Sequence, residues 1–285
     1  MLELARTPGA WDLGYGGDTL NTAIHLVRQG HQVSYLTALG SDPFSAHLRE
    51  AWAAEGLDLS LVLTNPGRVA GLYAITTDER GERSFTYWRD SSAAREMFAL
   101  ESAETLAAAV SNADLFCFSL VTLAILPIKH RTRLLGLAVR VRERGGRVAF
   151  DGNYRERLWK SAAEAREAHE QAIATSDIGL PTLDDEQSLW GAAGAAEVAS
   201  RWQSLGCSEV IVKLGADGCR LPVGAIVQPE RRLEPVDTSG AGDAFNAGYL
   251  GARLSGADPG DAACAGHRLA GWTIMRPGAI PSRNS

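Results

Sequence analysis

Residues 237–245 read DTSGAGDAF and lead directly into a helical pattern over 241–255. Small residues at 239–242 let the backbone approach a ligand closely, because large side chains would block it. A helix that begins here points free N–H groups and the positive end of its dipole at the loop, which creates an anion site. Asp243 places a carboxylate in that site, which favours a role as the base that deprotonates an attacking hydroxyl. This stretch alone also fits a glycine-rich turn capped by an aspartate.

Three other loops place glycine beside polar residues. Residues 16–21 (GGDTLN) run into a helical pattern, so Asp18 or Asn21 can bond sugar hydroxyls, although this turn taken alone is more typical of an ordinary helix cap. Residues 151–155 (DGNYR) and 213–218 (KLGADG) each follow a predicted strand. Ligand-facing loops of an open α/β sheet lie at such positions.

Short apolar runs alternate with helical patterns from residue 18 onward, which predicts an α/β layered fold. Strands are expected at 32–39, 114–119, 147–151, 177–180 and 209–214, and helices near 18–30, 43–56, 127–144, 161–174, 195–205, 241–255 and 258–275.

One region departs from this alternation. Residues 68–76 and 83–89 read as two strands joined by the polar turn 78–82, a small antiparallel insert beside the main sheet. It carries more aromatic and arginine side chains than a solvent face needs: Tyr73, Phe85, Tyr87, Trp88 and Arg89. A guanidinium suits a carboxylate, so Arg89 is a candidate clamp for an acidic acceptor. The alternatives are that Arg89 only covers the aromatic surface and that the tyrosines only pack.

The composition describes an ordinary soluble globular protein. The chain has 285 residues, 45% apolar and 22% charged, with a net charge of −6 that gives no sign of a nucleic-acid or acidic-membrane partner. The four cysteines lie far apart without a C-x-x-C pair, which argues against a zinc site or a disulfide framework. The sequence has neither an 18-residue apolar run nor a signal pattern, so we expect a cytoplasmic protein.

Together these features resemble the ribokinase family, also called the PfkB family, of carbohydrate kinases. DTSGAGDAF matches the C-terminal signature of that family, and GGDTLNTAIHLVRQG, LGSDPFS, GLYAITTDERGERSFTYWR, DGNYRERLW and AGHRLAG follow the expected order. The resemblance covers essentially the whole chain and is greatest to members that phosphorylate 2-keto-3-deoxygluconate. It implies a ribokinase-like three-layer α/β/α sandwich, a single kinase domain over 1–285, with a small antiparallel β lid formed by about 3–18 and 68–90.

The resemblance also implies the reaction and its residues. The expected reaction transfers phosphate from ATP to the sugar acid 2-keto-3-deoxy-D-gluconate, giving its 6-phosphate. The implied residues are Asp243 as the base with Gly240, Ala241 and Gly242 as the anion hole; Gly17, Asn21, Tyr73, Tyr87 and Arg89 on the sugar; Arg155 near the substrate or the transferred phosphate; and Asn153, Lys213, Gly215, Gly218 and His267 around the nucleotide.

A Mg²⁺ ion that bridges the phosphates and keeps most of its waters belongs to the same expectation. Many family members carry Asn-x-x-Glu near the metal waters. Thr182 and Asp185 stand at those positions here, so Asp185 or Glu186 is the implied metal residue, acting through water. The alternative is an acidic first helical turn that complements the helix dipole.

The beginning of the sequence departs from the family pattern. Relatives open with an apolar strand that ends in a Gly-Glu turn, and only its tail, residues 1–4 (MLEL), is present. We expect either a true start upstream or another segment in place of that strand, because a missing central strand leaves sheet edges unpaired.

Other functions stay open from the sequence. These are a fructokinase or another sugar kinase of the same family, and a catalytically silent sugar- or nucleotide-binding regulator. A Rossmann dehydrogenase would need G-x-G-x-x-G after an early strand, which residues 14–17 do not supply. Apolar residues on the outer side of the lid suggest a homo-oligomer.

Overall fold

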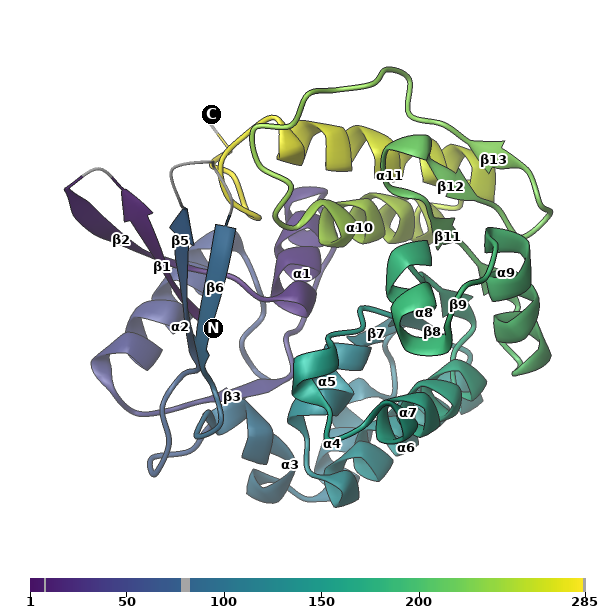
Figure 1. Cartoon of the computed structure of the whole chain (residues 1–285). Helices are drawn as coiled ribbons and strands as arrows, with labels where there is room; N and C mark the ends of the chain where they lie inside the picture. Colours follow the sequence, from purple (N-terminus) through teal and green to yellow (C-terminus); the bar gives the residue numbers. More distant parts are fainter. Residues whose placement is uncertain (8, 78–82, 284–285) are drawn as a thin grey trace.

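The computed structural model describes residues 1–7, 9–77 and 83–283, so the predicted turn 78–82 lies outside the described residues. A parallel sheet in the order β10-β9-β8-β7 forms the middle layer. Its strands are β7 (Leu115–Ser119), β8 (Arg147–Asp151), β9 (Ile178–Gly179) and β10 (Glu209–Val210). Helices cover both faces of this sheet (Figure 1), which confirms the α/β/α prediction.

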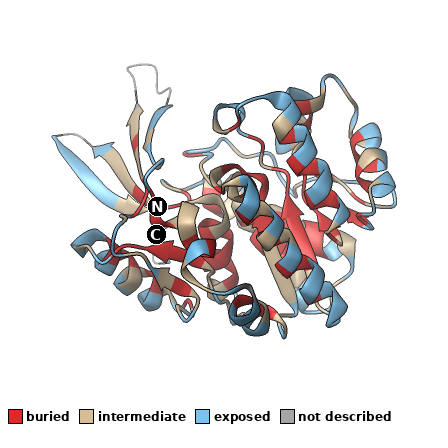
Figure 2. Cartoon of the chain, turned by 90° about the horizontal axis from the view of Figure 1, so that it is seen from below, coloured by how far each residue is buried: buried red, intermediate tan, exposed pale blue. Residues whose placement is uncertain are grey.

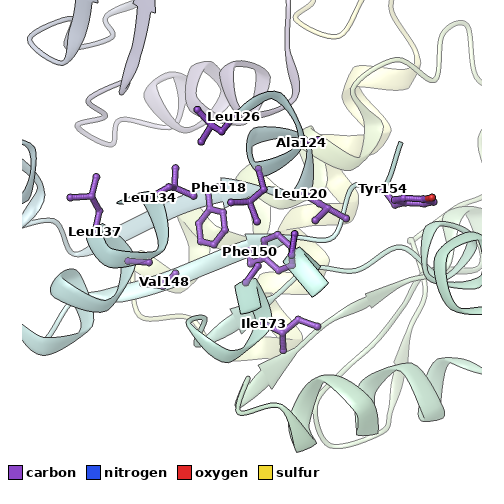
Figure 3. Packing of buried hydrophobic residues seen from close by; sticks show 14 of the residues in the cluster. Phe118, Leu120, Ala124, Leu126, Leu134, Leu137, Val148, Phe150, Tyr154 and Ile173 are labelled. Atoms are coloured by element: carbon purple, nitrogen blue, oxygen red, sulfur yellow. The ribbon is translucent and has the colours of Figure 1, made fainter. Parts of the chain in front are cut away.

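The two helical layers follow from alternation along β8. Val148 and Phe150 point into one core, which contains residues of α6 (Ile128–Glu143) and α7 (Ala162–Ala174). Figure 3 shows part of this cluster. Ala149 points into the other core, which α10 (Ala241–Leu254) and α11 (Pro259–Ile274) complete. Helix α1 (Asp18–Arg28) packs beside α10 (Figure 1).

A separate four-stranded sheet projects from one side of the molecule (Figure 1), and we call it the lid sheet. Its order is β2-β1-β5-β6, with β1 (Leu2–Thr7), β2 (Ala10–Tyr15), β5 (Leu72–Thr77) and β6 (Arg83–Trp88). Two antiparallel hairpins meet through the parallel pair β1 and β5, in which Leu2 lies opposite Leu72. Its strands are far more exposed than those of the central sheet (Figure 2).

The first residues of the chain belong to the lid sheet as β1. The predicted strand at 32–39 forms only over β3 (Thr37–Leu39), which pairs in parallel with β4 (Val62–Thr64). Within the described residues β7 pairs with β8 alone, so β3 and β7 each present an unpaired edge.

The remaining elements connect these layers. They are α2 (Pro43–Glu55), η1 (Ala93–Glu96), α3 (Met97–Leu100), α4 (Ala103–Val110), α5 (Leu120–Ile125), η2 (Glu156–Leu158), α8 (Leu183–Trp190), α9 (Ala195–Ser204), β11 (Val212–Lys213), η3 (Gly215–Asp217), β12 (Cys219–Arg220) and β13 (Ile226–Val227). All four cysteines are free thiols. Among the described residues, no helix has the length and apolar character needed to cross a membrane.

Candidate active site

The predicted anion site lies at the N-terminus of α10. Gly240 has φ +69°, and a Cβ there would lie 2.6 Å from the Cβ of Ala279, so only glycine fits this turn. The N–H of Ala241 donates to the carbonyl of Thr238 at 3.2 Å. The N–H groups of Gly240 and Gly242 donate to no acceptor in the described part of the chain, which leaves them available to an anion.

Asp237 stabilises this turn through two hydrogen bonds to backbone N–H groups. Its carboxylate accepts from the N–H of Ser239 at 2.8 Å and from the N–H of Gly278 at 2.6 Å. The same carboxylate therefore joins the loop before α10 to the segment after α11. Its burial makes these charge-assisted bonds strong and holds the open amides in place.

Asp243 lies in the first turn of α10 and contacts α1. The side-chain amide of Asn21 donates to its Oδ2 at 2.7 Å, and the hydroxyl of Thr22 donates to its carbonyl at 3.2 Å. Burial raises the pKa of Asp243 to about 7, and the negative charge of Asp18 acts in the same direction. The bond from Asn21 opposes this rise. A carboxylate that binds a proton near neutral pH can act as a general base.

A buried polar network underlies Asp243. Lys213 donates to Asp151 at 3.1 Å and to the side-chain oxygen of Asn246 at 3.0 Å, and Asn246 donates to Asp151 at 2.9 Å. The Lys213 ammonium lies close beneath the anion site, since a Cβ at Gly242 would lie 3.8 Å from it. It contributes positive charge below the helix N-terminus, while its hydrogen bonds bind it to the protein interior.

Asp18 faces the same space from the start of α1. It accepts from the hydroxyl of Ser119, at the end of β7, and from the amide of Asn153 at 3.4 Å. Burial raises the pKa of Asp18, and the charge of Asp151 adds to the rise. The start of α1, the end of β7 and the loop after β8 thus meet at Asp18.

The lid sheet presents an aromatic row toward this space. The hydroxyl of Tyr73 donates to Glu3 across the β1–β5 pair, and the pKa of Tyr73 is raised by burial, by Glu3 and by Asp243. The rings of Tyr73 and Tyr87 stack with centroids 5.8 Å apart. The guanidinium of Arg89 lies 4.3 Å from the centroid of Tyr87. One surface of the lid sheet therefore contains Tyr73, Tyr87 and Arg89. The charge of Asp243 reaches Tyr73, which places this surface beside the N-terminus of α10.

The entrance to α1 completes this surface. Gly17 has φ +147°, and its N–H donates to the side chain of Asn21 at 3.2 Å. A Cβ at Gly16 would lie 2.3 Å from the hydroxyl of Tyr73. The glycine pair thus lets the lid tyrosine approach the chain beside Asn21.

Two of the predicted nucleotide residues, Gly218 and His267, lie against the same residue of β13, Val227. Gly215 and Gly218 both have positive φ, and a Cβ at Gly218 would lie 2.1 Å from the carbonyl of Val227. That carbonyl is also 3.0 Å from Nε2 of His267, whose ring lies 5.1 Å from that of Phe245. Burial lowers the pKa of His267, which favours a neutral ring. That these residues share one nucleotide site stays a prediction. The common contact of Gly218 and His267 with Val227 supports it.

The two candidate metal residues have different surroundings. Asp185 is 3.0 Å from Arg155 and faces the site, where burial raises its pKa and the charge of Asp151 adds to the rise. Arg155 also donates to the carbonyl of Tyr154 at 2.6 Å.

Glu186 points into the core, where it contacts Arg201, His169 at 3.0 Å and the indole of Trp202 at 3.1 Å. Its two oxygens are occupied there, so we correct the prediction and remove Glu186 from the metal site. Within the described residues, no three His, Cys, Asp or Glu side chains converge on a metal position.

Sequence reasoning missed four residues that this region contains: Thr22, Ser119, Arg157 and Asn246. Ser119 ends a predicted strand, a position where ligand-facing side chains gather, and this signal could have found it. The other three become visible only through contacts between segments far apart in the chain.

Residues 2–285 match the pfkB family of carbohydrate kinases, and the chain belongs to that family. It is an ATP-dependent sugar kinase by this membership. The chain is similar to the 2-dehydro-3-deoxygluconokinase of Dickeya dadantii (strain 3937), with 42% identity over 98% of this chain and 94% of the relative. It is 40% identical to the 2-dehydro-3-deoxygluconokinase of Escherichia coli (strain K12), over 100% of this chain and 96% of the relative.

Among solved structures, a PfkB protein from Polaromonas sp. JS666 has a TM-score of 0.85 and 27% identity, covering 100% of this chain and 95% of that chain.

Proposed function

We propose that the protein transfers phosphate from ATP to the C6 hydroxyl of 2-keto-3-deoxy-D-gluconate. Relatives at 40–42% identity over nearly the whole chain are 2-dehydro-3-deoxygluconokinases, which supports this acceptor. The observation that carries the reaction is Asp243, a carboxylate with a pKa raised to about 7 at a helix N-terminus with open amides. This combination suits removal of a proton from an alcohol beside a bound phosphate.

In this mechanism the acceptor lies between the lid sheet and α10. Asp243 takes the proton of the attacking hydroxyl, and Asn21 orients the carboxylate through its 2.7 Å hydrogen bond. The amides of Gly240 and Gly242 stabilise the negative charge that develops on the transferred group, and Lys213 adds positive charge from below. Arg89, Tyr73 and Tyr87 bind the acid end of the sugar, so that its opposite end reaches Asp243.

The nucleotide would lie along Gly215, Gly218 and His267, with Asn153 and Arg155 toward the phosphates. Mg²⁺ fits the residues present, because Asp185 places a hard carboxylate oxygen where it could hold waters of an ion bound to the phosphates. Bound there, Mg²⁺ would neutralise phosphate charge. Asp185 would hold its waters, and Arg155 would orient Asp185 through their ion pair.

The test is a coupled ADP-release assay with 2-keto-3-deoxygluconate, fructose, ribose and gluconate. We expect preference for the keto acid, and loss of that preference in Arg89→Ala. A preference for fructose, with Arg89→Ala unchanged, would show a fructokinase or another neutral-sugar kinase. Ligand binding without ATP turnover in the intact protein would show a silent regulator.

The outer face of the lid sheet supports a homo-oligomer. Trp88 is 56% exposed, Trp11 is 51% exposed and Leu13 is 42% exposed, all on strands of this sheet. The registers place Leu13 opposite Leu4, and Leu72 opposite both Leu2 and Trp88. Alternation along the strands puts these side chains on the face away from the tyrosines. Gel filtration that shows only monomer at micromolar concentration would exclude this assembly. The cytoplasmic location stays a prediction.

A further inference from the structure

Arg157 joins the body of the kinase to the lid sheet. It lies in η2, shortly after the loop that follows β8, and its Cζ is 4.0 Å from the ring centroid of Tyr87. Arg89 has its own Cζ 4.3 Å from the same centroid. One ring of β6 therefore contacts two guanidinium groups, one from the lid and one from the body. Cation–π contacts of this kind fix the position of an otherwise mobile arginine.

Neither guanidinium forms an ion pair with a carboxylate in the described part of the chain, although the charges of Asp18 and Asp90 act on Arg89 from a longer distance. Their two distances from the shared centroid place them at most about 8 Å apart, which is inside the screening length of roughly 10 Å at 0.1 M salt. Within the described residues neither forms an ion pair, whereas Arg155, two positions before Arg157, pairs with Asp185. Burial lowers the pKa of Arg89 and the charge of Arg157 acts in the same direction, while Tyr87, Asp18 and Asp90 oppose the shift.

Like charges held this close leave a local excess of positive potential at the lid–body junction. An anion that reaches both guanidiniums beside the Tyr87 ring relieves the repulsion and gains charge-assisted hydrogen bonds from both. A neutral sugar does not reduce the repulsion between the two guanidiniums, because its hydroxyls carry no compensating charge. The arrangement therefore discriminates between acceptors by charge.

We propose that Arg157 is a specificity-determining residue, which supplies from the body the second positive charge that selects a carboxylate-bearing acceptor over a neutral sugar. This inference rests on the proposed function, since it assumes that the acid end of the acceptor lies beside Tyr87. Arg89, together with Tyr73 and Tyr87, anchors the acid to the lid. Arg157 also ties the bound acid to the body, so that carboxylate binding draws lid and body together.

The test compares 2-keto-3-deoxygluconate with its neutral primary amide, in wild type, Arg157→Gln and Arg157→Lys. Arg140→Gln, which removes an exposed arginine from α6, is the matched control for a lost charge. We expect Arg157→Gln to raise the KM for the acid about tenfold, with kcat within twofold, because a charge-assisted contact is lost. The inhibition constant of the amide should change less than twofold, Arg157→Lys should recover part of the loss, and Arg140→Gln should behave as wild type.

Two results overturn the proposal. Equal weakening of acid and amide in Arg157→Gln would show that Arg157 only packs against Tyr87, and an unchanged KM for the acid would show that it has no role in selection. Calorimetric binding of acid and amide without ATP separates this inference from the proposed function. A wild type that binds the acid in preference to the amide but does not phosphorylate it contradicts the function alone.

Discussion

Replacing Asp243 by asparagine should make the protein more stable while removing its activity. The pKa of Asp243 is raised to about 7 by burial and by Asp18, whereas an unfolded aspartate ionises near pH 4. Ionised Asp243 therefore costs the folded state free energy. The cost is absent below about pH 4, grows between about pH 4 and 7, and is constant above.

The size of the effect follows from the same values. A pKa raised from 3.8 to about 7 corresponds to roughly 4 kcal/mol at pH 8, at about 1.4 kcal/mol for each pH unit. Solvent reaches part of this half-buried carboxylate, so we expect a smaller gain of about 1–3 kcal/mol. Asparagine keeps an oxygen that can accept the bond from Asn21, which limits other losses.

Urea unfolding of wild type and Asp243→Asn at pH 5, 6, 7 and 8 measures this difference directly. The excess stability of the variant should grow with pH up to about 7 and then level off. Asn246→Asp serves as the opposite control, because it adds a buried carboxylate beside Asp151 and should destabilise. A variant no more stable than wild type at pH 8 would refute the reasoning about the electrostatics of this site.

Three further predictions concern the same region. Asn21→Ala removes the hydrogen bond that favours the ionised form of Asp243, so the acid limb of the pH profile of kcat/KM should move to higher pH; an unshifted limb would assign it to another group. Gly240→Ala should destabilise the fold by about 1–3 kcal/mol and raise the KM for ATP, measured by urea unfolding and ADP release, because Cβ strains the turn and meets Ala279. Asp185→Asn should raise the Mg²⁺ concentration for half-maximal activity severalfold at constant ATP, and an unchanged titration curve would remove Asp185 from the metal site.

The sequence predicted the layers well because hydrophobic periodicity reports which face of each element is buried. The role of Asp243 stays a prediction, which the open amides at the start of α10 support, although the stretch alone also fits a glycine-rich turn capped by an aspartate. The short extent of β3 was not predicted, because strand length depends on partners supplied by distant segments.

Two neighbouring residues show why the roles of side chains were harder to predict from the sequence than the layers of the fold. Asp185 and Glu186 are equivalent in composition, but adjacent positions on a helix point about 100° apart. The rotation of α8 is set by packing against His169 and Trp202, which sequence does not reveal. Lys213 was predicted at the nucleotide loop, yet its ammonium is buried between Asp151 and Asn246, because a buried charge needs several acceptors.

The most direct test of the account is the single-turnover rate of Asp243→Asn with saturating ATP, Mg²⁺ and 2-keto-3-deoxygluconate at pH 8. Loss of a positioned general base should slow phosphoryl transfer by about 10²–10⁴-fold, while the affinities for sugar and nucleotide stay near those of wild type. A rate within fivefold of wild type in the folded variant would contradict the assignment of Asp243 as the base.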